Sequence, residues 1–202
     1  MEPRTPNEFA VVQKYKSSIL LTKEEITTLH RLRNDSLLDE KTSPVPLELR
    51  EKDFRGIDFF PILGKYQFRL KFHKYANPEP VPISLSNGQR VDALRAGYFG
   101  FELDGKRVKL YAYKKRLGDA EMFLPFKDKT SGKETYGTGR YLDLYGTSDD
   151  NYVLDFNLAY NPLCAFDEMK YDCPLPPAEN WLMDVEIRAG EMRVKSERLR
   201  AK

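Results

Sequence analysis

The feature that most constrains this fold is an alternation of apolar and polar residues that begins near residue 66. Between Tyr66 and Phe72, aromatic and aliphatic residues alternate with polar ones, as in a strand that buries one face. The same alternation flanks Asp104 and Gly105, a dipeptide that strongly favours a β-hairpin. The pattern predicts further strands at residues 81–85, 90–94, 121–127, 139–145 and 152–156, and an edge strand at 185–187. Short strands joined by short turns indicate a mainly β protein, either an antiparallel β-sandwich or a small β-barrel.

Two segments outside the strands carry signals of their own. Thr22 and Glu25 form a capping box, which predicts the start of an N-terminal amphipathic helix that ends before the prolines of residues 43–46. Four prolines within residues 161–178 exclude a central strand, so we expect an ordered proline-rich loop across the sheet. We therefore divide the chain into an N-terminal extension with the helix (1–46), a β-rich core domain (47–191) and a basic C-terminal tail (192–202).

Composition limits the classes of function. A chain of 202 residues with 41% hydrophobic residues can bury a single core. The formal charge of +2 is too balanced for a long nucleic-acid footprint, so only the basic tail could contact nucleic acid or an anionic surface. No apolar run approaches the roughly 20 residues of a membrane helix, and the N-terminus lacks the layout of a secretory signal. We therefore expect no membrane contact and a cytoplasmic location.

Strand parity places two opposite charges inside the predicted core. Arg140 shares its strand face with Leu142, and Asp128 shares its face with Phe126. A hairpin through residues 129–138 then brings Asp128 and Arg140 together at one end of the core. Either the two side chains form a structural ion pair, or part of the guanidinium stays free to bind a carboxylate or a phosphate.

The loop between these strands is rich in glycine and hydroxyl groups and contains Lys133. Such a loop either forms a cradle for an anion or is a structural hairpin loop, and it does not match a nucleotide P-loop. We predict a pocket for a small, anionic molecule between the hairpin loop of residues 128–140 and the loop of residues 155–180. The expected ligand-binding residues are Arg140, Lys133, Asp128, Thr130, Tyr136, Asp155, Asn157, Tyr160, Asn161, Cys164, Cys173 and Asn180.

Other classes of function stay open. An enzyme, either a hydrolase or a flavin-dependent protein on a split-barrel-like fold, would use Asp128 or Asp155 as acid or base and Cys164 as nucleophile. A protein-interaction or homodimerisation module is the third class, and exposure of Tyr111, Tyr113, Tyr141 and Tyr145 would favour it.

Metal and redox signals are weak. The chain has two cysteines and two histidines, without the spacing of a zinc site, so we expect no metal and assign no cofactor. We expect both histidines, His30 and His73, at the surface or as caps. A reducing cytosol would keep Cys164 and Cys173 as thiols, although a disulfide across this short loop is conceivable.

Three phrases of the sequence resemble the family known as Domain of Unknown Function 1684. They are TSGKETYGTGRYLDL (130–144), LDFNLAYNPLCAF (154–166) and DCPLPPAENWL (172–182). The resemblance extends from about Leu47 to Glu191, and the chain departs from the family at MDVEIRAGE (183–191), where members more often have a proline-containing phrase. The family is bacterial and archaeal, and the resemblance implies no activity, cofactor or catalytic residue.

Overall fold

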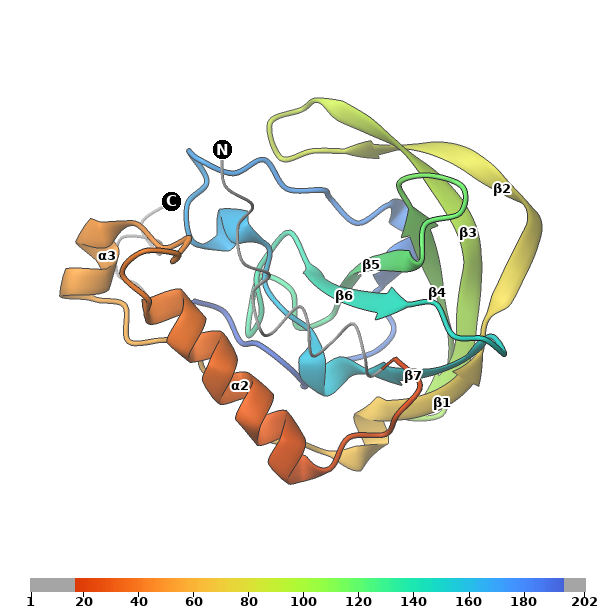
Figure 1. Ribbon diagram of the computed structural model, residues 1–202, viewed down its shortest axis with the longest axis horizontal. Coiled ribbons are helices and arrows are strands. Elements are labelled where there is room, and N and C mark those ends of the chain that lie inside the picture. The colour runs from red at the N-terminus through yellow and green to blue at the C-terminus, as the bar shows by residue number, and fades with distance from the viewer. Residues whose placement is uncertain (1–16, 195–202) are drawn as a thin grey trace.

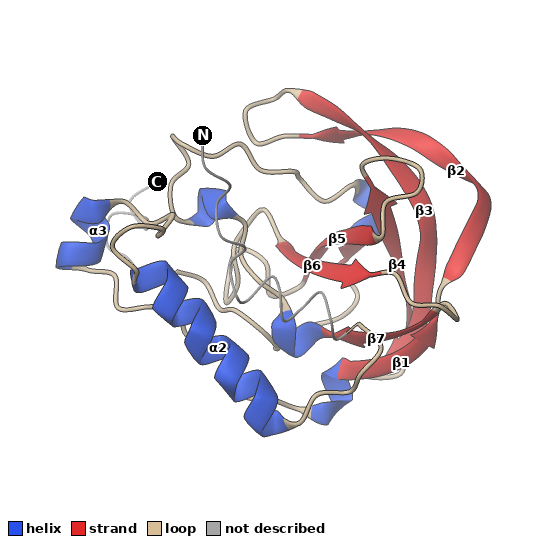
Figure 2. Cartoon of the chain, in the orientation of Figure 1, coloured by secondary structure: helices blue, strands red, loops and turns tan. Residues whose placement is uncertain are grey.

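Strands gather on one side of the molecule and helices on the other (Figure 1 and Figure 2). The structure, a computed structural model, describes residues 17–194. Helix α2 (Lys23–Leu38) begins at the predicted capping box, where Thr22 Oγ1 accepts a hydrogen bond from the Glu25 amide and the Glu25 carboxylate accepts one from the Thr22 amide. Pro46 precedes the short helix α3 (Leu47–Lys52), which the sequence pattern did not predict.

The strands form two mainly antiparallel sheets. They are β1 (Gln67–Lys71), β2 (His73–Ser84), β3 (Arg90–Leu103), β4 (Lys106–Lys114), β5 (Glu121–Asp128), β6 (Arg140–Tyr145), β7 (Asn151–Asp155) and β8 (Trp181–Leu182). The larger sheet has the order β2-β3-β4-β5-β6, with β8 pairing in parallel with β5, and the smaller sheet pairs β1 with β7. The described residues also form the 3-10 turns η1 (Gly64–Tyr66), η2 (Phe156–Leu158), η3 (Leu163–Ala165) and η4 (Ala178–Asn180).

The predicted mainly β, antiparallel class is confirmed. The turn between β3 and β4 is the expected hairpin, in which Asp104 and Gly105 both have positive φ angles (49° and 75°), as a type I′ turn requires. Within residues 17–194 the sheets do not close into a barrel. The split-barrel-like alternative therefore has no support from the strand order.

The main core lies between the inner faces of the two sheets. Phe99, Leu110 and Leu124 of the larger sheet are completely buried, as are Leu154 and Phe156 at the end of the smaller sheet. Aromatic rings connect the sheets, because Phe101 and Phe126 both contact Phe156. A second apolar cluster fills the space beneath the helices and contains Leu37, Val45, Leu49, Phe54, Ile57, Ala165, Phe166 and Val194.

Buried polar contacts connect helix α2 to the β-rich part of the chain. Arg33 Nε lies 2.7 Å from Glu191 Oε1, and both side chains are almost fully buried. A ring nitrogen of His30 lies 2.8 Å from the carbonyl oxygen of Asn157, and its ring stacks on Phe59. The expectation of a surface or capping role was therefore wrong for His30. Burial lowers the pKa of this imidazole.

The predicted edge strand at residues 185–187 was wrong. These residues form no strand, although Val185 and Ile187 are buried as the alternation required. Groups of the β5–β6 hairpin bond to their carbonyls instead: the Lys129 amide donates to Val185, and the Arg140 side chain donates to Ile187.

None of the helices in the described part of the chain is long and apolar enough to cross a membrane. The cytoplasmic location and the division at residues 46 and 191 stay predictions. The basic tail lies almost wholly in residues 195–202, outside the described residues.

Candidate functional site

Arg140 and Asp128 form a buried ion pair at one end of the core, as strand parity predicted. Arg140 Nη2 lies 3.0 Å from Asp128 Oδ2, and neither side chain has more than 1% of its surface exposed. The guanidinium also donates to the carbonyl oxygens of Ile187, Ala189 and Glu191. Burial lowers the pKa of Arg140, and Asp128 opposes this shift. Protein groups occupy both Nη atoms, which favours the structural ion pair over a guanidinium free to bind a ligand, and a ligand-binding role of Arg140 stays a prediction.

The glycine-rich hairpin loop is closed by its own hydrogen bonds. The amides of Lys133, Glu134 and Thr135 all donate to the carbonyl oxygen of Thr130, and the Gly132 amide donates to Thr135. The Thr130 and Thr135 hydroxyls are 2.9 Å apart and buried, and the Thr130 amide donates to the Asp128 carboxylate. These amides are not available to cradle an anion, so the structural interpretation of the loop holds.

Three asparagines of the predicted site each form hydrogen bonds to a different backbone segment. The Asn157 side chain bonds to both the amide and the carbonyl of Leu63, and Asn180 does the same at Tyr111. Asn161 donates through its amide to the Glu191 carboxylate and through its side chain to Met192. All three are buried and act as structural clamps.

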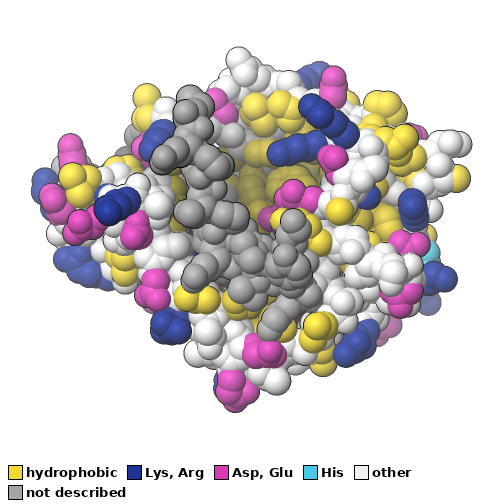
Figure 3. Space-filling view, in the orientation of Figure 1, with side chains coloured by type: hydrophobic (Ala, Val, Ile, Leu, Met, Phe, Trp, Pro, Cys, Tyr) yellow, Lys and Arg dark blue, Asp and Glu magenta, His cyan; other side chains and the backbone are white. Residues whose placement is uncertain are grey.

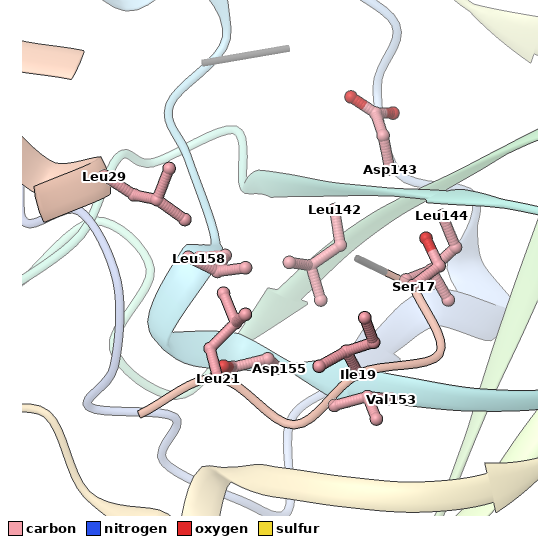
Figure 4. A pocket seen from close by; sticks show the side chains of 10 residues that line it. All are labelled: Ser17, Ile19, Leu21, Leu29, Leu142, Asp143, Leu144, Val153, Asp155 and Leu158. Carbon is pink, nitrogen blue, oxygen red and sulfur yellow. The ribbon is translucent and has the colours of Figure 1, made fainter. Parts of the chain in front are cut away.

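Asp155 belongs to a small cavity rather than to an open site. Its carboxylate accepts hydrogen bonds from Gln67 and Asn157, and burial raises its pKa against the effect of these donors. The cavity has a volume of about 20 Å³, which is room for about one water molecule. Leucine side chains surround most of it, and Asp143 points away from them to the other side of β6 (Figure 4).

A much larger pocket opens on that other side of the sheet. Its volume is about 490 Å³, within the usual range for small-molecule sites. The walls come from the ends of β2 and β3, from β4 to β6 and from the loop of residues 160–174. Figure 3 shows it as a hollow with a hydrophobic floor and charged groups at its rim. Its aromatic lining residues are Tyr113, Phe123, Tyr141, Tyr160 and Tyr171.

The wall beneath the loop is fixed by hydrogen bonds between Tyr141 and Tyr160. Each tyrosine donates its amide to the carbonyl of the other, at 2.9 and 3.0 Å, and their rings meet edge to face. The Tyr160 hydroxyl donates to Asp143 Oδ2 at 2.5 Å. Burial raises the pKa of Asp143 to about 6, although this hydrogen bond and Lys115 oppose the shift. The pocket therefore contains a carboxyl group that titrates near neutral pH.

Carboxylates outnumber amines around the pocket. Burial and the nearby Lys74 lower the pKa of Lys114, whose amine donates to the carbonyl oxygen of Asp119 at 2.6 Å. The amines in the lining are Lys114 and Lys115, and the carboxylates are Asp92, Asp119, Glu121, Asp143 and Asp172.

The two cysteines lie next to each other at the edge of the pocket. The Cys164 amide donates to Cys173 Sγ at 3.0 Å. The contact with Cys173 and burial raise the pKa of the Cys164 thiol, whereas the contact with Cys164 lowers the pKa of Cys173 despite burial. Both thiols are free, and Cys173 lines the pocket.

Of the twelve predicted site residues, Tyr160 and Cys173 line the large pocket. Lys133 is exposed in the hairpin loop, and the Tyr136 hydroxyl donates to the carbonyl of Cys164 with burial raising its pKa. Sequence reasoning missed Asp143, yet one signal could have found it: Asp143 alternates with buried leucines on β6. The other predicted residues, Asp128, Thr130, Arg140, Asp155, Asn157, Asn161, Cys164 and Asn180, are engaged in the structural contacts described above.

Fold and site together define a small, mainly antiparallel β protein with an open aromatic pocket beside a buried ion-pair network. Residues 52–192 match the model of the family described as Protein of unknown function (DUF1684), so the chain belongs to this family. The chain is also similar to the solution NMR structure of an uncharacterized protein from gene locus rrnAC0354 of Haloarcula marismortui. That similarity has 31% identity and a TM-score of 0.64, and covers 84% of this chain and 93% of the archaeal one. No curated protein matches the chain.

Proposed function

We propose that this protein binds a small molecule in the pocket between β6 and the loop of residues 160–174. The observation that carries the proposal is the pocket itself, with a volume of about 490 Å³ and a wall of aromatic rings around the Asp143 carboxyl group. Apolar concave sites with a few placed polar groups are the usual anatomy of ligand pockets. As predicted from the sequence, the loop of residues 155–180 forms one wall of this pocket. The opposite wall is β6, not the predicted hairpin loop.

The ligand that fits this lining has an aromatic or aliphatic body and an amine or another hydrogen-bond donor. Asp143 carries a negative charge at neutral pH, because its pKa of about 6 lies below 7. Arg140 and Lys133, which were to bind an anion, do not line the pocket, and carboxylates outnumber amines there. We therefore propose a cationic or neutral ligand in place of the anionic one expected from the sequence.

Three probes with the same ring and different charges test this proposal. Binding of benzylamine, benzyl alcohol and benzoate to the full chain is measured by ligand-observed NMR at pH 7.5. We expect benzylamine to bind most tightly and benzoate most weakly. Asp143→Asn should weaken benzylamine about tenfold, which corresponds to about 1.4 kcal/mol for a charged hydrogen bond.

The matched control is Glu102→Gln, which removes a carboxylate from the exposed part of β3 outside the pocket and should leave all three affinities unchanged. Preferential binding of benzoate would refute the charge assignment. Native mass spectrometry of the freshly purified protein complements the titrations. If it shows no bound small molecule and none of the probes binds, the proposed function is wrong.

A second candidate is acid–base catalysis in the same pocket, favoured by the pKa of Asp143. A carboxyl group that titrates near pH 6 beside a hydrogen-bonded tyrosine can exchange a proton with a substrate at physiological pH. Asp128 and Asp155 are engaged elsewhere, so Asp143 takes the role that they had in the sequence-based hypothesis. Hydrolysis of p-nitrophenyl acetate should then change rate around pH 6 in the natural chain and not in Asp143→Asn.

The interaction module stays a prediction. Four tyrosines were expected to mark an interface if they were exposed. Tyr113 and Tyr141 are buried, whereas Tyr111 and Tyr145 are partly exposed. Size-exclusion chromatography with light scattering tests the homodimer directly.

A further inference from the structure

We propose that Cys164 and Cys173 form an oxidation site, in which a peroxide entering the large pocket converts the two thiols into a reversible disulfide. The proposal goes beyond the binding of a ligand and does not rest on it, because it needs only the pocket as a route to Cys173. The two cysteines stand at opposite ends of a ten-residue segment, whose last three residues line the pocket.

The contacts assign different roles to the two cysteines. Cys173 lines the pocket, whereas Cys164 is not part of the lining, so an oxidant in the pocket meets Cys173 first. A thiolate at Cys173 is stabilised by the Cys164 amide, whose nitrogen lies 3.0 Å from its sulfur. Since the thiolate is the nucleophile, Cys173 attacks and Cys164 resolves.

Burial argues for a reaction between these two cysteines rather than between molecules. Only 2% of Cys164 and 4% of Cys173 is exposed, so neither sulfur reaches the surface for a disulfide with a second chain. A small peroxide can enter a 490 Å³ pocket that excludes another protein. Cys173 Sγ already lies 3.0 Å from the Cys164 amide nitrogen, so the second step needs no large movement of the loop.

The chemistry balances with hydrogen peroxide as the oxidant. The Cys173 thiolate attacks one peroxide oxygen, an S–O bond forms, the O–O bond breaks and hydroxide leaves to become water. Cys164 sulfur then attacks Cys173 sulfur, so that an S–S bond forms, the S–O bond breaks and the second water leaves with the Cys164 proton. The two thiols lose two electrons, which reduce the peroxide, and a dithiol such as dithiothreitol reverses the change.

The test treats the full reduced chain with equimolar hydrogen peroxide at pH 7.5 and follows its intact mass. The natural chain should become about 2 Da lighter by loss of two hydrogens, peptide mapping should join Cys164 to Cys173, and dithiothreitol should restore the starting mass. Cys164→Ser should instead accumulate a sulfenic acid on Cys173, which dimedone traps. Cys173→Ser should leave Cys164 at least about tenfold less reactive than Cys173, because Cys164 is buried and does not line the pocket.

Serine keeps the size and a hydrogen-bonding group, and circular dichroism of each variant shows whether it has folded. Blocking the pocket gives a second readout: Ala93→Trp adds an indole ring to the lining and should slow disulfide formation several-fold while both cysteines stay in place. Oxidation to a dimer linked between chains would overturn the proposal. Equal dimedone labelling of the two serine variants, or no mass change in the natural chain, would overturn it as well.

Discussion

Removal of the Asp128 charge tests the central structural conclusion, that Arg140 forms a structural ion pair with Asp128. Asp128→Asn keeps the side-chain shape and leaves an acceptor for the Thr130 amide, which now bonds to Asp128 Oδ1 at 2.7 Å. It also leaves the Arg140 cation buried with only carbonyl partners. Breaking a buried pair in this way destabilises proteins by about 3 to 5 kcal/mol.

Replacement of the arginine should cost more than replacement of the aspartate. Arg140→Met leaves the Asp128 carboxylate without its ion-pair partner, and three carbonyls lose their side-chain donor, those of Ile187, Ala189 and Glu191. With about 3 to 5 kcal/mol for the pair and about 1 kcal/mol for each carbonyl, we expect a loss of about 6 to 8 kcal/mol. That is a large share of the 5 to 15 kcal/mol that is typical of a whole domain.

Urea unfolding followed by circular dichroism and Trp181 fluorescence measures these losses. The double variant with both substitutions should lose at least about 2 kcal/mol less than the sum of the single variants, because each single variant leaves an unpaired buried charge. The exposed Lys65–Asp104 pair is the matched control, and Asp104→Asn should cost less than about 1 kcal/mol. A coupling below about 1 kcal/mol, or an Asp128→Asn cost no larger than the control, would refute the reasoning.

Four further outcomes follow from local geometry. Because burial raises the pKa of Asp143 to about 6, protonation of Asp143 favours the folded state, and this contribution is present below pH 4 and lost as the pH rises through 6. Urea unfolding across this range should show the natural chain losing about 3 kcal/mol relative to Asp143→Asn. Gly139→Ala should cost more than about 3 kcal/mol by the same assay, because φ is 111° and a Cβ atom would lie 2.4 Å from the Phe126 carbonyl oxygen. Gly88→Ala, with φ at 85° and open space around it, should cost only about 1 kcal/mol. Thr22→Ala removes the helix cap and should lower the unfolding free energy by about 1 kcal/mol.

Local patterns predicted the strands and one long-range contact. The alternation in β5 and β6 turned Asp128 and Arg140 inward, and the hairpin between the strands then required the two side chains to meet. Burying either charge alone would be costly, so their pairing followed from the sequence and simple energetics. The helix start at Thr22 was predictable for a similar reason, because a capping box is a local signal.

Features made by distant segments could not be predicted in this way. Val185 and Ile187 have the alternation of a strand, yet a side chain and a loop amide take their carbonyls. Tyr141 lies on the outward face of β6 but is buried, because the loop of residues 160–174 covers it and accepts its hydroxyl hydrogen bond at Pro174. Periodicity says nothing about the path of such a loop, and therefore nothing about the pocket beneath it.

The polar residues of this chain thus have two kinds of role: some stabilise the fold, and others line the pocket. Glu191 accepts hydrogen bonds from Arg33 and from the Asn161 amide, and its carbonyl accepts one from Arg140, so a single residue connects the helix, the loop and the core. Asn161 directly follows Tyr160, whose hydroxyl bonds to Asp143 in the pocket. The buried network therefore fixes the position of the tyrosine that lines the site. A substitution in the network should loosen the pocket as a consequence of destabilising the fold, whereas Asp143→Asn should change binding while the fold is kept. Measuring stability and probe binding on the same variants distinguishes these two roles.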